Sequence, residues 1–238
     1  SNIKDMTKLF SGKINFNKLL LWNVSNVEIM KDLFEDCKEF NQPLNNWNVS
    51  NVIDMSFLFL GCTYFNQPLS CWNMRNVENT RFMFKNCFNF NQPLNNLDVS
   101  NVKSMTFMFE KCVNFNQPLD KWDVGNVINM SNMFKKCFSF NQYLNNWDVS
   151  NVKNMYRMFT YCINFNQPLD KWNVKKVEDT SEMFRKCKSF NQSLNNWDVS
   201  NIVYMNSMFA VCVQFNQPLD KWNTSKVKNI SGIFNGCS

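Results

Sequence analysis

The residues best suited to chemistry in this sequence are its ten cysteines, because thiolates can bind metals, attack electrophiles and form disulfides. Nine of them recur every 25 residues: Cys37, Cys62, Cys87, Cys112, Cys137, Cys162, Cys187, Cys212 and Cys237. The 238 residues contain no Cys-x-x-Cys pair and no histidine, so the usual zinc-binding spacings are missing. The sequence predicts no metal site and no cofactor.

We interpret this cysteine column as a row of free thiols that pack as small buried apolar groups. Nine is an odd number for pairing, and a disulfide needs Cα atoms within about 7 Å, whereas neighbouring helices lie about 8–10 Å apart. Cys71 lies outside the column, where other units carry lysine or asparagine. We expect Cys71 to be the reactive thiol.

Catalysis would need unlike side chains that converge on one pocket, and few residues here suit that purpose. Histidine, the commonest acid–base side chain, is absent, and the five glycines form no glycine-rich phosphate loop. Carboxylates such as Asp120, Asp123, Asp170 and Asp220 recur from unit to unit, which is typical of a scaffold. We predict that the protein is not an enzyme.

These residues recur because the whole chain is an internal repeat of 25 residues. Other columns are Phe40, Phe65, Phe90, Phe115, Phe140, Phe165, Phe190 and Phe215, and Trp22, Trp47, Trp72, Trp122, Trp147, Trp172, Trp197 and Trp222. Leu97 fills the gap in the tryptophan column, and one residue is missing between Phe16 and Trp22. We expect one solenoid domain over residues 1–238 with about nine repeats. We also expect it to be a piece of a longer protein whose capping units lie outside it.

The pattern within a unit predicts one short parallel strand followed by one short helix. Trp147 and Val149 alternate with Asp148, so a strand here would bury the first two and expose the third. Apolar residues from Val152 to Cys162 then follow helical spacing, with Ser150 or Asn151 as a candidate N-cap. The predicted fold class is therefore an α/β repeat solenoid that is leucine-rich-repeat-like.

Three further features describe how the units connect. Proline occupies six of the eight Phe-Asn-Gln-x-Leu loops, which indicates an extended return segment outside any sheet interior. The repeated asparagine and glutamine, such as Asn141 and Gln142, are interpreted as caps and ladders for backbone groups at the corners. Alternate units carry Asn-Asn or Asp-Lys before the tryptophan, so the exposed surface is expected to alternate from rung to rung.

The repeat motif of this chain resembles that of the BspA-like leucine-rich repeat surface proteins. The motif reads Phe-Asn-Gln-Pro-Leu-x-x-Trp-Asp-Val-Ser-Asn-Val-x-x-Met-x-x-Met-Phe. That repeat is found in surface proteins and lipoproteins of mycoplasmas, Listeria and related bacteria, and in giant-virus proteins. The resemblance covers Ile3 to Cys237 and implies a surface protein linked to adhesion and virulence. This chain departs from the pattern in its cysteine column, which leaves a virion or cytoplasmic location open.

The outward positions next to the tryptophans are the candidate contact surface, because repeat proteins bind partners on such extended faces. The candidate residues are Lys121, Asp123, Asn146, Asp148, Lys171, Asn173, Asn196 and Asp198. Their mixed charge favours a protein or glycan partner, and the alternative is that they only keep the surface soluble. The net charge of +6 is dispersed, so we expect no nucleic acid partner. No run of 18 apolar residues suggests a membrane span, and the oligomeric state stays open.

Two functions follow from these observations, and nucleic-acid binding through the alternating lysine column is a third, least favoured alternative. The first is a non-enzymatic binding module at the cell surface or in the secreted fraction, which mediates adhesion or contact with a host. The second is an intracellular or virion scaffold that recruits a protein partner, which the free thiols favour because reducing compartments preserve them.

Overall fold

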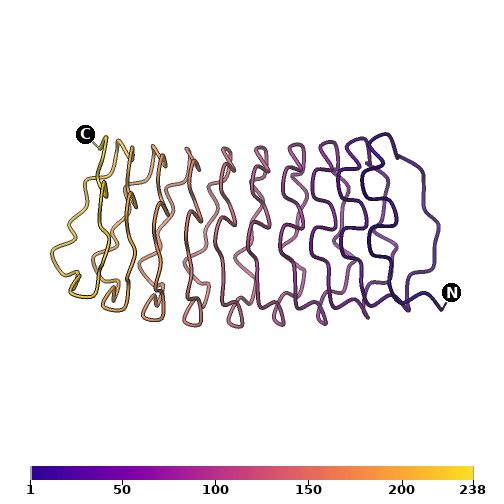
Figure 1. The fold of residues 1–238 in the computed structure, drawn as a ribbon, viewed down its shortest axis with the longest axis horizontal. Coiled ribbons are helices and arrows are strands. Elements are labelled where there is room, and N and C mark those ends of the chain that lie inside the picture. Colours follow the sequence, from indigo (N-terminus) through magenta and orange to yellow (C-terminus); the bar gives the residue numbers. More distant parts are fainter. Residues whose placement is uncertain (1, 238) are drawn as a thin grey trace.

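The computed structural model describes residues 2–237, and it shows them as one continuous stack of similar rungs (Figure 1). The chain runs from the N-terminal rungs at one end of the stack to the C-terminal rungs at the other, along a nearly straight axis. Consecutive rungs are joined by nine isolated parallel bridges, from Asp5↔Ile29 to Tyr204↔Asn229. The predicted repeat solenoid is confirmed.

The predicted strand at each tryptophan is wrong, although its pattern of burial is right. Trp147 and Val149 are buried and Asp148 is exposed, as the alternation predicts. The rungs are not bridged there, however. The bridge lies at Asn154, inside the segment that was predicted as helix. Within residues 2–237 every strand is reduced to such a single bridge.

The predicted helix between Val152 and Cys162 is also wrong, because this segment is a series of turns. The N–H of Met158 donates to the carbonyl of Met155, and the N–H of Cys162 donates to that of Phe159. The residues between these turns donate to the next rung, as Phe159 does to Met183 at 2.9 Å. No helix occurs in the part of the chain that the structure describes.

The spacing of the rungs explains why turns replace helices. Strands that are bridged to one another lie about 4.8 Å apart, whereas packed helices need about 8–10 Å. A nearly straight stack with one bridge per rung therefore has no room for a helix in every rung. Turns solve the problem because alternate N–H groups can point along the stack to the neighbouring rung.

These turns require left-handed backbone at two positions of a typical rung. In one rung they are Arg157, with φ of 56°, and Tyr161, with φ of 66°. Left-handed residues reverse the chain locally, which breaks the right-handed path that a helix would need. Glycine occupies the equivalent of Tyr161 at Gly61, where φ is 75°.

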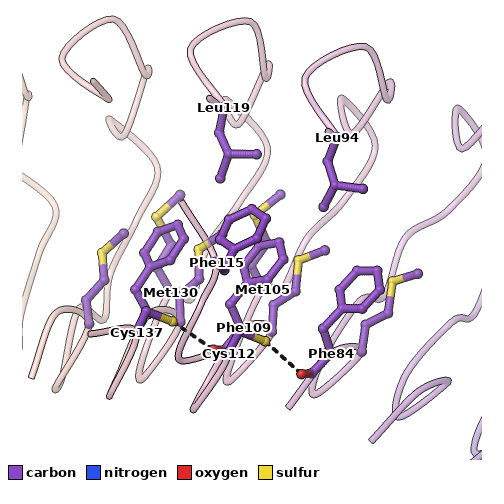
Figure 2. Packing of buried hydrophobic residues seen from close by; sticks show 14 of the residues in the cluster. Phe84, Leu94, Met105, Phe109, Cys112, Phe115, Leu119, Met130 and Cys137 are labelled. Carbon is purple, nitrogen blue, oxygen red and sulfur yellow. Dashed lines mark hydrogen bonds between the residues drawn. The ribbon is translucent and has the colours of Figure 1, made fainter. Parts of the chain in front are cut away.

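The interior of the stack is filled by apolar columns that run from rung to rung (Figure 2). Phe109 and Phe115 stack within one rung with ring centroids 4.5 Å apart, and Phe109 stacks on Phe84 of the preceding rung at 5.6 Å. Cys112 also lies inside this core and donates from Sγ to the carbonyl of Phe84. The cysteine column is thus part of the core, as predicted.

The asparagine and glutamine columns satisfy backbone groups between rungs, as predicted. The Oδ1 of Asn116 accepts a hydrogen bond from the N–H of Asn141 and another from the side-chain amide of Gln142, both at 2.9 Å. Asn151 donates to the carbonyl of Gly125 in the preceding rung. Asn151, a predicted helix cap, therefore caps a turn of the neighbouring rung instead.

Candidate interaction surface

The eight predicted contact residues are all exposed, and they form two polar columns on either side of the buried tryptophan column. The outer column alternates lysine and asparagine, and it contains Lys121, Asn146, Lys171 and Asn196. The inner column carries carboxylates and amides, and it contains Asp123, Asp148, Asn173 and Asp198. We call these eight residues the polar columns. Their exposure agrees with a contact surface.

The inner column also stabilises the backbone. The Oδ1 of Asp148 accepts a hydrogen bond from the N–H of Ser150 at 3.0 Å, and Asp123 binds the N–H of Gly125 in the same way. Hydrogen bonds from the hydroxyl and then the backbone N–H of Ser200 lower the pKa of Asp198, and the corresponding bonds from Ser150 lower the pKa of Asp148. One carboxylate oxygen is thus occupied by a turn, and only the rest of the group is free for a partner.

The outer column is supported by a contact that pairs rungs. Asn145 donates from its amide to Asp170 at 2.8 Å, and its Oδ1 accepts a hydrogen bond from the N–H of Lys171 at 3.0 Å. We call this arrangement the asparagine clasp. Equivalent clasps join Asn95 to Asp120 and Asn195 to Asp220. The clasps give a physical reason for the alternation of Asn-Asn and Asp-Lys units.

The tryptophans fix the floor between the polar columns. The indole N–H of Trp147 donates to the carbonyl of Leu119 in the preceding rung, at 2.9 Å. Trp147 also stacks on Trp172 with ring centroids 6.5 Å apart. Because each ring is held by a hydrogen bond and by its neighbour, the side chains above it project from a rigid surface.

One break in the tryptophan column lies beneath two of the predicted residues. Leu97 replaces tryptophan there, and an open hollow above it is lined by Asn96, Asp98, Lys121 and Asp123, among others. Lysine and carboxylate groups thus face a common depression. The hollow is shallow and open to solvent, which suits part of a larger ligand better than an enclosed small molecule.

The cysteines offer little chemistry in the folded state. Burial raises the pKa of Cys37 to about 11, and it raises the pKa values of deeper members such as Cys112 and Cys137 further. Cys71 is exposed, in agreement with its position outside the column, and its Sγ accepts a hydrogen bond from Asn45. Within the described residues no cluster of three or more histidine, cysteine or carboxylate side chains could hold a metal ion.

Sequence reasoning missed a second polar surface, on the turn segments that were predicted as helices. Lys85 and Lys135 both lie 2.8 Å from the carboxylate of Glu110, which sits in the rung between them. Burial alone would raise the pKa of Glu110, but the two lysines outweigh it and the pKa is lowered. The repeat period was a sufficient signal to align these residues, because each pair is separated by 25 positions.

Comparisons with known proteins give one family match and several similar solved structures. The family described as "Mycoplasma protein of unknown function, DUF285" matches residues 1–97, 80–192 and 162–238. Solved structures that are similar include a leucine-rich repeat protein from Bacteroides ovatus, which is 12% identical, with a TM-score of 0.38, over 99% of this chain and 80% of that one. No curated protein matches the chain.

Between residues 2 and 237 the structure contains no helix that is long and apolar enough to cross a membrane.

The three overlapping matches to the family model together extend over all 238 residues. This coverage identifies the chain as a member of the family described as "Mycoplasma protein of unknown function, DUF285".

Proposed function

We propose that this protein is a non-catalytic binding module that contacts a protein or glycan partner through the polar columns. The observation that carries the proposal is the exposure of all eight polar-column residues on a floor of buried, hydrogen-bonded tryptophans. A rigid surface loses little conformational entropy when it binds, so even modest contacts can add up along several rungs. The hollow above Leu97 and an equivalent hollow above Trp47 give this surface local features that a partner can fill.

We propose further that the module is displayed at the cell surface or secreted and mediates adhesion, as the BspA-like resemblance implies. The alternative is an intracellular or virion scaffold, for which free thiols would be an argument only if they were open to oxidation. Burial and raised pKa values shield most of that column from oxidants, whatever the compartment. The thiols therefore do not distinguish the two locations, and the resemblance makes display the preferred proposal.

Binding through the polar columns is tested with labelled protein on glycan arrays, protein arrays and intact host cells. Lys121→Ala combined with Lys171→Ala removes two exposed ammonium groups while their backbone N–H groups stay in the clasps. We expect a loss of about three- to tenfold in affinity for any partner of the wild type, because each polar contact at a rim contributes about 1 kcal/mol or less. A matched control, Lys153→Ala with Lys228→Ala, removes the same charge from two exposed positions that directly precede the bridging residues Asn154 and Asn229.

The result would contradict the proposal if both double variants bound every wild-type partner with unchanged affinity.

Location is tested separately by protease treatment of intact source cells or particles, followed by mass spectrometry of released peptides. Release of repeat peptides before lysis supports display. Protection until lysis rejects display and supports the internal scaffold.

A further inference from the structure

A second surface of the stack has a local excess of positive charge. Between residues 85 and 186 the turn segments carry seven cations and two carboxylates, so these nine residues have a net charge of +5. The cations are Lys85, Lys111, Lys135, Lys136, Arg157, Arg185 and Lys186, and the carboxylates are Glu110 and Glu182. We call these nine residues the basic patch.

Contacts within the basic patch hold its charges in a regular order along the stack. Glu110 is bound on either side by lysines of the neighbouring rungs, each at 2.8 Å. Glu182 is bound by Arg157 of the preceding rung at 2.6 Å and by Arg185 of its own rung at 2.9 Å. Each carboxylate is thus shared by two cations. The patch keeps an excess of positive charge even where it forms ion pairs.

Among the described residues, three lysines of the patch form no ion pair with a carboxylate: Lys111, Lys136 and Lys186. Lys111 and Lys136 occupy equivalent positions of adjacent rungs, both with positive φ, and neither takes part in an ion pair among the described residues. Like charges on adjacent rungs of such a stack repel one another. A carboxylate placed between them would relieve this repulsion, as Glu110 does between Lys85 and Lys135.

The aromatic residues of this surface argue against nucleic acid as the ligand. Phe82 is stacked between Phe57 and Phe107 with centroid distances of 4.5 and 4.6 Å, so both of its faces are covered. Tyr161 is covered by the ammonium group of Lys186, 4.4 Å from the ring centroid. Binding of single-stranded nucleic acid relies on open ring faces on which bases can stack. Here recognition must come from charge.

We propose that the basic patch binds an acidic polypeptide segment, whose carboxylates bridge the unpaired lysines in the way that Glu110 and Glu182 bridge their neighbours. Arginine and lysine clusters that recognise acidic motifs are a common mode of peptide binding. The turns fix the backbone under each cation by hydrogen bonds to the next rung, as between Lys111 and Lys135. Along each rung the bridging residue, such as Asn154, lies between the polar columns and the basic patch, so the two surfaces can be tested separately.

The test is fluorescence anisotropy with a labelled decaglutamate peptide at low and physiological salt. We expect saturable binding that weakens with salt, because the charges are screened. Lys111→Glu with Lys136→Glu should reduce the affinity at least about tenfold, since two attractive contacts become repulsive. Lys121→Glu with Lys171→Glu makes the same change of charge on the polar columns, and it should reduce the affinity less than about threefold.

Circular dichroism confirms that each variant is folded, and Glu182, with φ of 55°, shows that the turns accept glutamate at a left-handed position. Equal losses in the two double variants would overturn the proposal, because binding would then depend only on net charge. Tighter binding of oligo-dT or of a sulfated glycan of matched charge would also overturn it. Absence of decaglutamate binding would reject the basic patch as a site but leave the polar columns, which are tested with other partners, unaffected.

Discussion

At the scale of single residues, the clearest feature is that one side chain often serves two rungs. The indole of Trp147 fills the core and also satisfies the carbonyl of Leu119 in the preceding rung. The same bond recurs at Trp122, with the carbonyl of Leu94 as acceptor. A hydrogen bond that is made inside the core adds about 1 kcal/mol and costs more when one partner is removed. The column is therefore sensitive to the exact residue type.

Leu97 provides a natural test of that dependence, because it is the one position of the column without an indole. Leu97→Trp should donate to the carbonyl of Leu69, 28 residues earlier, as the other tryptophans do at that separation. We expect a gain of about 0.5–1.5 kcal/mol in the free energy of unfolding. Trp147→Leu, the reverse change, should cost about 2–4 kcal/mol through lost volume and an unpaired carbonyl. Urea unfolding measures both, and a loss in both variants would show that the site around Leu97 is too tightly packed for an indole.

The thiols provide a second prediction at this scale. In the native protein Cys71 should react with an aromatic disulfide reagent at pH 8 within minutes, because it is exposed. The deeper cysteines should react only after unfolding, since burial blocks the reagent and raises their pKa values, which keeps them protonated at that pH. Denaturant should then reveal ten thiols. Cys71→Ser is the control, and rapid labelling of several thiols in this variant would contradict the buried column.

At the scale of elements, the turn segment shows both how far sequence reasoning reached and where it stopped. Met155, Phe159 and Cys162 are buried, as their spacing predicts. The same spacing fits a helix and a series of turns, because turns that close every three to four residues bury side chains with nearly the helical period. Only the distance between rungs decides between them. That distance follows from the bridges at positions such as Asn154, which the pattern did not indicate.

The candidate site was predictable to a similar extent. Alternation around Trp147 was enough to place the polar columns on the surface, and the repeat predicted the asparagine ladders. The asparagine clasp was not predicted, because Asn145 meets Asp170 and Lys171 only when rungs are stacked in one particular register. The basic patch was missed for a related reason. Charges that are dispersed in the sequence gather on one side only when the turn segments are aligned.

The left-handed turn positions lead to a prediction about this element. Val211 has φ of 62°, which is strained for a branched side chain, and the equivalent positions in two other rungs are Gly61 and Gly236. Val211→Gly should therefore raise the free energy of unfolding by up to about 1 kcal/mol. Relief of about 1–2 kcal/mol of backbone strain exceeds the cost of about 0.5–1 kcal/mol for ordering a glycine backbone. Ala210→Gly, next to it at an ordinary φ, should lower the stability by about 0.5–1 kcal/mol. Thermal melts compare the two, and equal losses would show that the valine is unstrained.

At the scale of the whole molecule, the stack behaves as a chain of neighbouring contacts. Backbone bonds, phenylalanine stacking and the asparagine clasps all join one rung to the next, and the bridges join residues only 24 or 25 positions apart. The stability of such a protein is approximately the sum of terms from each rung and each interface. An ordinary domain with one closed core does not have this property. We therefore expect that whole rungs can be deleted while the rest of the stack stays folded.

Deletion of residues 145–194 tests that additivity, because it removes two repeats and joins Leu144 to Asn195 in the same sequence context as before. We expect a folded protein whose urea m-value is lower by about a fifth, since m follows the surface exposed on unfolding. Deletion of residues 145–169 removes one repeat and leaves Asp170 without its clasp partner. Its free energy of unfolding should lie below the midpoint between the full chain and the longer deletion, by about 0.5–1 kcal/mol. A longer deletion that fails to fold, as judged by circular dichroism, would show that the rungs depend on contacts beyond their neighbours.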